Sequence, residues 1–120
     1  MTSPSPTPAD RFEDDGRYRA AVDLTLSQLI DQIDELDAEI DARLMPGNLQ
    51  VVFEDDGSTF ILSQQTPTHE LWLSANLRAW HFRWRGGRWV ERDTAEPMLP
   101  LLSRLFAEKT AQPVSFDEAP

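Results

Sequence analysis

The feature that most constrains the fold of this chain is a series of short, strand-like segments separated by turn sequences. Three turn signals divide residues 37–91, namely Pro46-Gly47-Asn48, Asp55-Asp56-Gly57 and Gly86-Gly87. Between them apolar and polar residues alternate, as in Leu49, Val51 and Phe53, which places the apolar side chains on one face of a strand. Short strands joined by turns at this spacing predict an antiparallel meander of about six strands.

An amphipathic helix is expected on each side of this meander. Before it, apolar residues recur at helical spacing in the series Val22, Leu26, Leu29, Ile33 and Leu36. After it, a second apolar face consists of Met98, Leu101, Leu102, Leu105 and Phe106. Two such helices would cover one face of the sheet and leave the other face to solvent, which is an α+β fold.

The boundaries of the elements follow from the same patterns. We expect the first helix to begin between Asp10 and Arg17, and the second to hold Pro100 in its first turn, with Asp93 or Thr94 as a cap. The strands are predicted at 37–44, 49–53, 59–63, 70–74, 79–85 and 88–91, with a loop at 64–68. Residues 1–9 are rich in Ser, Thr and Pro and predict a disordered tail, residues 10–116 one folded domain, and residues 117–120 a loose end.

The composition excludes several classes of function. A formal net charge of −10 argues against nucleic-acid binding, which needs a basic surface, and favours a cation or a basic protein as partner. The chain has no cysteine, so disulfides, thiolate metal sites and cysteine-based catalysis are excluded. Neither a membrane-spanning apolar run nor a signal peptide is recognisable, so we expect a cytoplasmic protein without a membrane partner.

The most unusual stretch is residues 31–41, which contain six carboxylates and no base: Asp31, Asp34, Glu35, Asp37, Glu39 and Asp41. We call these six residues the acidic ridge. The first three are neighbours on a helix, and the last three share one face of the predicted strand. Oxygen ligands this dense favour a hard cation such as iron, manganese, magnesium or calcium, bound weakly at several sites. Asp23 is a weaker candidate, and a solvated acidic face without a ligand is the alternative.

The second candidate surface is the open face of the sheet. Alternation within 70–74 and 79–85 places Trp72, His81 and Arg83 on the side opposite the large apolar residues. An exposed tryptophan beside an arginine is typical of a protein interface. The alternative is that Trp72 is a covered edge residue. His69 and His81 are too isolated in sequence to indicate a zinc site.

Several stretches together resemble the bacterial branch of the frataxin family. The most specific are Gln65 to Ser74, which runs from Gln-Thr-Pro to Trp-Leu-Ser, and the triplet Trp80-His81-Phe82. Further similarity lies in Asp37 to Asp41, in Phe53 to Ser58 and in Pro113 to Phe116, so that the resemblance spans roughly Arg17 to Phe116. The chain departs from the usual family pattern at Ser63, at Arg78-Ala79, at Asp55-Asp56 and at Pro100.

The resemblance implies a fold of two helices on one face of an antiparallel sheet and a role in iron–sulfur cluster assembly. It implies that the acidic ridge, with Asp23 as a weaker member, binds ferrous or ferric iron weakly at the surface and contacts a basic patch on a cysteine desulfurase. Trp72, together with His81 and Arg83, would contact the desulfurase or the iron–sulfur scaffold protein. The expected protein is a regulator of the desulfurase or an iron donor, not an enzyme, and a monomer that forms oligomers with iron.

Two other functions would use the same surface. One is a ferroxidase that oxidises ferrous iron at the ridge, and the other is an acidic adaptor that binds only protein. A dedicated ferroxidase site usually has Glu-x-x-His motifs on facing helices, and the sequence has none. It also has no EF-hand loop, no His-Glu-x-x-His motif, no phosphate-binding loop and no nucleophile elbow.

Overall fold

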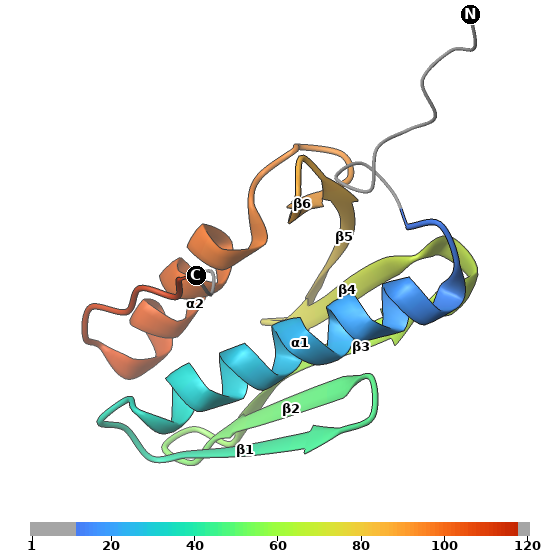
Figure 1. The fold of residues 1–120 in the computed structure, drawn as a ribbon. Helices are drawn as coiled ribbons and strands as arrows, with labels where there is room; N and C mark the ends of the chain where they lie inside the picture. The colour runs from blue at the N-terminus through green and yellow to red at the C-terminus, as the bar shows by residue number, and fades with distance from the viewer. Residues whose placement is uncertain (1–11, 118–120) are drawn as a thin grey trace, which may run out of the picture.

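The computed structural model describes residues 12–117, which form two helices and one six-stranded sheet (Figure 1). The helices are α1 (Asp15–Asp34) and α2 (Met98–Thr110). The strands are β1 (Ile40–Met45), β2 (Asn48–Phe53), β3 (Ser58–Gln65), β4 (Glu70–Ala75), β5 (Arg78–Arg85) and β6 (Arg88–Glu91). Both helices lie on the same face of the sheet (Figure 1), which confirms the predicted α+β fold.

The sheet is the predicted antiparallel meander. Each strand pairs with its neighbour in sequence, in the order β1-β2-β3-β4-β5-β6. Leu49, Val51 and Phe53 are all buried under the helices, as their alternation predicts. Gly47 closes the β1–β2 turn with a φ of 68°, and a Cβ atom at this position would lie 2.3 Å from Cδ of Gln64. Only glycine therefore fits this turn without displacing the Gln64 side chain of β3.

Several strand ends differ from the predictions by one residue, and three other local predictions are wrong. The first strand begins at Ile40 instead of 37, because residues 35–39 form a connecting segment in which the Ala38 N–H donates to the Leu36 carbonyl at 3.0 Å. The loop predicted at 64–68 is instead the end of β3 followed by a short 3-10 helix, η1 (Thr66–Thr68), with a proline in its first turn. The predicted caps Asp93 and Thr94 do not cap α2, whose N-cap is Pro97.

The helix α1 begins at Asp15, inside the predicted range, because Asp14 caps it. The Asp14 carboxylate accepts the N–H of Arg17 at 2.8 Å, which satisfies a donor that the helix itself leaves unpaired. The buried face of α1 comprises Tyr18, Val22, Leu26, Leu29 and Ile33. Each of these large apolar side chains stabilises the fold by about 1.5–3 kcal/mol through burial. The observed stripe therefore starts one turn earlier than predicted, at Tyr18, and ends at Ile33, because Leu36 lies beyond the end of α1.

The helix α2 buries the five residues that were predicted to face the core. Pro100 lies in its first turn, as predicted, where a backbone N–H has no partner within the helix. After the helix the chain returns to the core at Phe116, whose N–H donates to Oγ of Ser103 at 2.8 Å and whose ring packs against Phe106. No helix in residues 12–117 is both long and apolar enough to span a membrane.

Two hydrogen bonds of Tyr18 join the helical layer to the sheet. Its buried hydroxyl donates to the carbonyl oxygen of Glu70 and accepts the N–H of Gln65 at 2.8 Å. These two backbone groups flank η1, so Tyr18 closes the corner between β3 and β4. Burial raises the pKa of Tyr18 above its ordinary value, which keeps the hydroxyl protonated as a donor. His69, at the end of η1, stacks on the Tyr18 ring with 4.6 Å between ring centroids.

We expect Tyr18→Phe to lower the free energy of unfolding by about 1–3 kcal/mol, because the part-buried N–H of Gln65 and the buried carbonyl of Glu70 lose the hydroxyl that bonds to them. Urea unfolding followed by tryptophan fluorescence measures this change. Thr68→Val is the matched control, since it removes an exposed hydroxyl that bonds to the Gln65 carbonyl at the same corner. A Tyr18→Phe protein as stable as the wild type would refute this role of the hydroxyl.

Candidate functional site

The acidic ridge spans the end of α1, the following connection and the start of β1. Asp31 and Asp34 lie in the last turn of α1, and Glu35 is its C-cap. Asp37 and Glu39 lie in the connecting segment and not on a strand, which corrects the predicted strand face, while Asp41 lies within β1. Five of the six side chains are exposed and Asp41 is half-buried. The six acids thus lie on consecutive segments of the chain, from the last turn of α1 to the start of β1.

The ridge is electrostatically uncompensated. The last turn of α1 contains no basic residue, although the negative end of the helix dipole lies there. Among the described residues, Asp41 is the one ridge member with an ion-pair partner, Arg43, whose Nη2 lies 3.1 Å from Oδ2 of Asp41. The side chain of Arg43 is 71% exposed and that of Asp41 is 41% exposed, so solvent screens the pair and it contributes little to stability. Within residues 12–117, no ion pair balances the charges of the other five ridge carboxylates.

The fold brings two further acids, predicted only as part of a turn, next to the ridge. Asp55 and Asp56, in the β2–β3 hairpin, line a polar hollow of about 450 Å³ together with Asp37 and Glu39. The Glu54 N–H donates to the Glu39 carbonyl at 3.1 Å and holds the hairpin against the ridge. The pairing of the first two strands was the signal that could have placed this hairpin beside the ridge, because it sets Ile40 opposite Phe53.

Asp56 is compensated, unlike the ridge acids. The hydroxyl and backbone N–H of Ser58 donate to Oδ1 of Asp56, and Lys109 donates to Oδ2 at 2.9 Å. These contacts hold the pKa of Asp56 below its ordinary value. Lys109 therefore crosses from α2 to the hairpin and closes one side of the polar hollow, while Asp55 remains exposed beside the ridge.

The ridge is not a preformed metal cage. Residues 12–117 contain no group of three His, Asp or Glu side chains close enough together to hold one ion. Asp23 is exposed on α1 but lies eight residues before Asp31, about 12 Å along a helix axis. It is therefore not part of the ridge surface. An exposed, uncaged set of oxygen ligands fits weak binding at more than one place.

The open face of the sheet contains the second candidate surface. Trp72 pairs across the sheet with Ser63 on β3 and His81 on β5, and its two neighbours Leu71 and Leu73 are buried under the helices. Trp72 is half-buried, and its ring meets that of His81 edge to face, with 4.5 Å between centroids. The predicted orientation of this strand is therefore the observed one.

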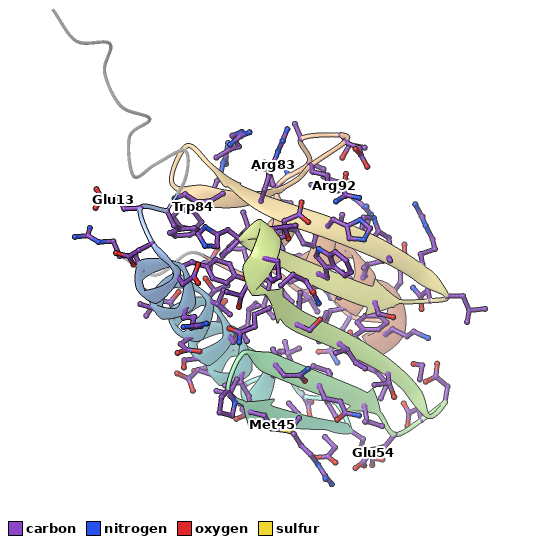
Figure 2. The ribbon with its side chains drawn as sticks, turned by 90° about the vertical axis from the view of Figure 1, so that its right-hand side faces the viewer. Glu13, Met45, Glu54, Arg83, Trp84 and Arg92 are labelled. Carbon is purple, nitrogen blue, oxygen red and sulfur yellow. The ribbon has the colours of Figure 1, made fainter. Side chains whose placement is uncertain are left out.

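Arginines gather at the β5–β6 end of this face. Arg83 is exposed on β5, and its Nη2 donates to the carbonyl oxygen of Arg92 at 3.3 Å. Figure 2 shows Arg83 and Arg92 together at this end of the sheet, away from Met45 and Glu54, which belong to the β1–β2 end beside the ridge. The two candidate surfaces thus have charges of opposite sign and lie toward opposite edges of one sheet.

A buried carboxylate fixes the loop after β6. Glu91 is 5% exposed, and its side chain accepts the backbone N–H groups of His81, Asp93 and Thr94 at 3.0, 2.7 and 3.3 Å. Burial acts to raise the pKa of Glu91, but the three N–H donors outweigh it and hold this pKa below its ordinary value. The loop is thereby folded back so that Arg92 lies beside Glu70.

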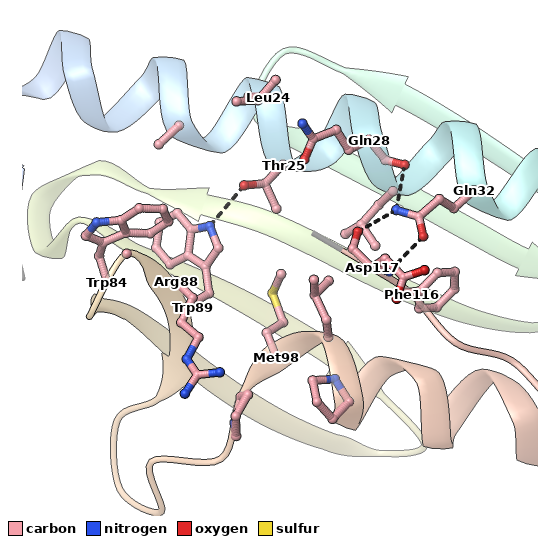
Figure 3. A pocket seen from close by; sticks show the side chains of 16 residues that line it. Leu24, Thr25, Gln28, Gln32, Trp84, Arg88, Trp89, Met98, Phe116 and Asp117 are labelled. Carbon is pink, nitrogen blue, oxygen red and sulfur yellow. Dashed lines mark hydrogen bonds between the residues drawn. The ribbon is translucent and has the colours of Figure 1, made fainter. Parts of the chain in front are cut away.

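A separate hollow of about 660 Å³ lies between α1, β6 and α2 (Figure 3). Trp84, Trp89 and Met98 line its apolar part, and Nε1 of Trp89 donates to Oγ1 of Thr25 at 3.0 Å. The charged residues among those lining it are Arg88 and Asp117. None of the predicted site residues lines this hollow.

Comparisons with known proteins identify the family and the fold of the chain. The family described as the frataxin-like domain matches residues 12–112. The chain belongs to the frataxin family. It is 35% identical over 106 residues to the iron-sulfur cluster assembly protein CyaY of Pseudomonas entomophila, a match that covers 87% of this chain and 96% of the relative. It is 39% identical over 77 residues to CyaY of Ralstonia nicotianae, covering 64% of this chain and 67% of the relative.

Solved frataxin structures share the fold. Frataxin from Psychromonas ingrahamii superposes with a TM-score of 0.81 at 23% identity, covering 88% of this chain and 99% of that one. Trimeric frataxin from the yeast Saccharomyces cerevisiae, complexed with ferrous iron, superposes with a TM-score of 0.67 at 20% identity, covering 88% of this chain and 94% of that one. The ridge and the Trp72 surface of this frataxin-family chain thus lie on the fold that the family shares.

We expect the stability difference between the wild type and Glu91→Gln to depend on pH. Because the folded pKa of Glu91 is lowered, its stabilising effect is complete above the ordinary glutamate pKa of about 4.3 and is lost as the pH falls through the lower folded value. Glu91→Gln should therefore lower the free energy of unfolding by about 1–3 kcal/mol at pH 7 and by less below about pH 4.

Urea unfolding between pH 3 and 7 measures this difference. Glu54→Gln is the control, because Glu54 is exposed and its side chain makes none of the backbone contacts of Glu91. If the stability difference between the wild type and Glu91→Gln stayed constant from pH 3 to 7, the stabilising role of the Glu91 carboxylate would be contradicted.

Proposed function

We propose that this frataxin-family protein binds iron through the acidic ridge and takes part in iron–sulfur cluster assembly, as a regulator of a cysteine desulfurase or as an iron donor. The observation that carries the proposal is a row of six carboxylates without an intervening base, five of them exposed and lacking an ion-pair partner among the described residues. Curated relatives that the chain matches nearly end to end are named iron-sulfur cluster assembly proteins.

The charge and the chemistry of the ridge support both ligands. Carboxylate oxygens are suitable ligands for ferrous and ferric iron, and their exposure allows rapid exchange. The same charges complement a basic patch on a protein, and steer it from a distance. Iron and a basic partner protein therefore either compete for the ridge or bind to it together. In both cases the amount of bound iron changes how the ridge binds the desulfurase.

The open sheet face is proposed as a second contact with the assembly machinery, either with the desulfurase or with the scaffold protein. Trp72, His81 and Arg83 form a half-buried aromatic pair beside an exposed guanidinium. Such a combination supplies the large apolar contact and the charged rim of a protein interface. The protein is proposed to be a monomer that associates further when iron is bound.

We propose that the protein is not an enzyme. Within the described residues, no histidine lies on the ridge, and the hollow between α1 and α2 is lined by one carboxylate, Asp117, and one base, Arg88. A ferroxidase would need iron ligands that hold two oxidation states in a fixed geometry, which an exposed ridge does not supply. Iron that is oxidised in the presence of the protein should therefore react at close to its rate in buffer.

Replacing the six ridge residues together with their amides should remove iron binding and leave a folded protein that is at least as stable. The wild type should bind more than one ferrous ion, each with a dissociation constant on the order of micromolar or weaker. The melting temperature should not fall in low-salt, metal-free buffer, because mutual repulsion is relieved. Calorimetric titration and thermal melts measure both quantities.

A matched pair of variants separates position from net charge. Asp34→Asn/Glu35→Gln should weaken iron binding, whereas Asp93→Asn/Glu108→Gln removes the same charge elsewhere and should not. Equal effects of the two pairs, or a single tight site in the wild type, would count against the ridge.

Trp72→Ala should weaken binding to a complex of cysteine desulfurase and scaffold protein while leaving iron binding unchanged. Truncation of an interface tryptophan commonly costs about 2 kcal/mol or more of binding free energy. The melting temperature should change little, because Trp72 is half-buried on the open face. Leu24→Ala, which shortens an exposed apolar side chain on the helical side, is the control.

Surface-immobilised desulfurase–scaffold complex reports the binding of each variant, and thermal melts report folding. A Trp72→Ala protein that melts normally and binds as the wild type does would overturn the second surface. The ridge proposal would stand in that case, because its test uses iron.

A further inference from the structure

The indole of Trp72 is held in place by a buried carboxylate, Glu70, which forms a part-buried ion pair with Arg92. Its Nε1 donates to Oε1 of Glu70 at 2.9 Å, and Nη1 of Arg92 lies 3.3 Å from the same oxygen and 3.4 Å from Oε2. The Glu70 side chain is 8% exposed, whereas that of Arg92 is 40% exposed. Glu70 is therefore covered on the open face by the two side chains that it binds, although it lies on the side of β4 that faces away from the helices.

Both ends of this arrangement are anchored in the fold. The backbone of Glu70 is fixed by the Tyr18 hydroxyl from the helical layer. The backbone of Arg92 donates to the His81 carbonyl at 2.9 Å, within the loop that Glu91 folds back. The carboxylate of Glu70 therefore joins two parts of the chain that are otherwise separated by 22 residues. Both anchors therefore help to hold the carboxylate of Glu70 beside the indole.

The geometry also determines what a partner can contact. Because the Nε1–H group of Trp72 already donates to Glu70, it is not available to a partner. One side of the ring is taken by the edge-to-face contact with His81. A partner therefore meets the ring itself, so the contact is apolar or cation–π in kind and depends on the angle at which the ring is held.

We propose that Glu70, supported by Arg92, is a positioning residue that fixes Trp72 in the orientation used for partner binding. This inference rests on the proposed function of the open face and names the residue that prepares it. Preorganisation of this kind increases affinity, because the side chain does not lose its freedom at the moment of binding. Glu70 itself does not touch the partner, since its carboxylate is covered by Trp72 and Arg92.

Two substitutions of Glu70 separate the effect of its hydrogen-bond acceptor from the effect of its negative charge. Glu70→Gln keeps an oxygen that accepts from the indole, whereas Glu70→Leu removes it with little change in size. We expect Glu70→Leu to weaken binding to the desulfurase–scaffold complex by about 3- to 10-fold, the equivalent of one net hydrogen bond, and Glu70→Gln to bind nearly as the wild type does. Arg92→Met should have an intermediate effect, because the indole keeps its acceptor.

A second measurement reports the orientation directly. The Nε1–H signal of Trp72 in a nitrogen–proton NMR spectrum should move and broaden in Glu70→Leu and stay close to its place in Glu70→Gln. In a Trp72→Phe background, which keeps a ring but has no N–H, Glu70→Leu should cause no further loss of binding. Iron titrations should be the same in all of these proteins, which separates this role from the ridge.

The outcomes are distinguishable from a failure of the proposed function. If Trp72→Ala weakens binding but Glu70→Leu changes neither binding nor the Trp72 signal, the positioning role is wrong. If Trp72→Ala has no effect on binding, the open face is not the partner surface, and the indole signal alone decides whether Glu70 positions Trp72. Equal losses in Glu70→Leu with and without the Trp72→Phe substitution would also overturn the inference, because Glu70 would then act by another route.

Discussion

The hydroxyl of Tyr18 is the interaction on which the arrangement of both layers depends. It is a fully buried polar group, so its two hydrogen bonds determine where α1 can rest on the sheet. Apolar packing alone is not directional and would allow α1 to slide along the sheet. The bonds to Gln65 and Glu70 remove that freedom at one end of the helix. Its other end, where Asp31 and Asp34 lie, is thereby placed over β1.

This frataxin-family protein separates its charges along the sheet. Residues 31–41 contain six acids and no base, whereas residues 78–92 contain five arginines and one acid, the buried Glu91. The first group is attached to the β1 edge and the second to the β5–β6 edge. Opposite charges at opposite edges of the sheet would orient a basic partner as it approaches. A partner that contacts both proposed surfaces would meet them at opposite edges of the sheet.

The sequence predicted those parts of the fold that depend on local patterns. The turns at Gly47, Gly57 and Gly86-Gly87 and the alternation between them are local, and the meander followed from them. The start of β1 was placed too early because the acids at 37 and 39 alternate with apolar residues as a strand would, although they lie in a connection. Periodicity cannot distinguish a strand from such a connecting segment when the polar residues face water in both.

The candidate site was predictable only in part, because local sequence patterns do not show which distant segments meet. The ridge is contiguous in sequence and could be named residue by residue, but its role stays a prediction. The neighbouring Asp55 and Asp56 come from a hairpin that the sheet register brings beside it. Alternation places Glu70 on the open face beside Trp72, and its burial depends on Trp72 and on Arg92, which lies in the loop after β6. Such contacts between distant residues produce no periodic pattern in the sequence.

The position of β1 at the margin of the sheet has a consequence for how copies of the molecule meet. Within the described part of the chain, β1 pairs only with β2, so the backbone groups on its outer side are available to another strand. Leu44 and Met45 are exposed on it, which would favour such pairing. The negative charges at its start oppose it, because two identical edges repel each other when they approach. Cations that screen these charges would weaken the repulsion and so favour edge-to-edge contact between two copies.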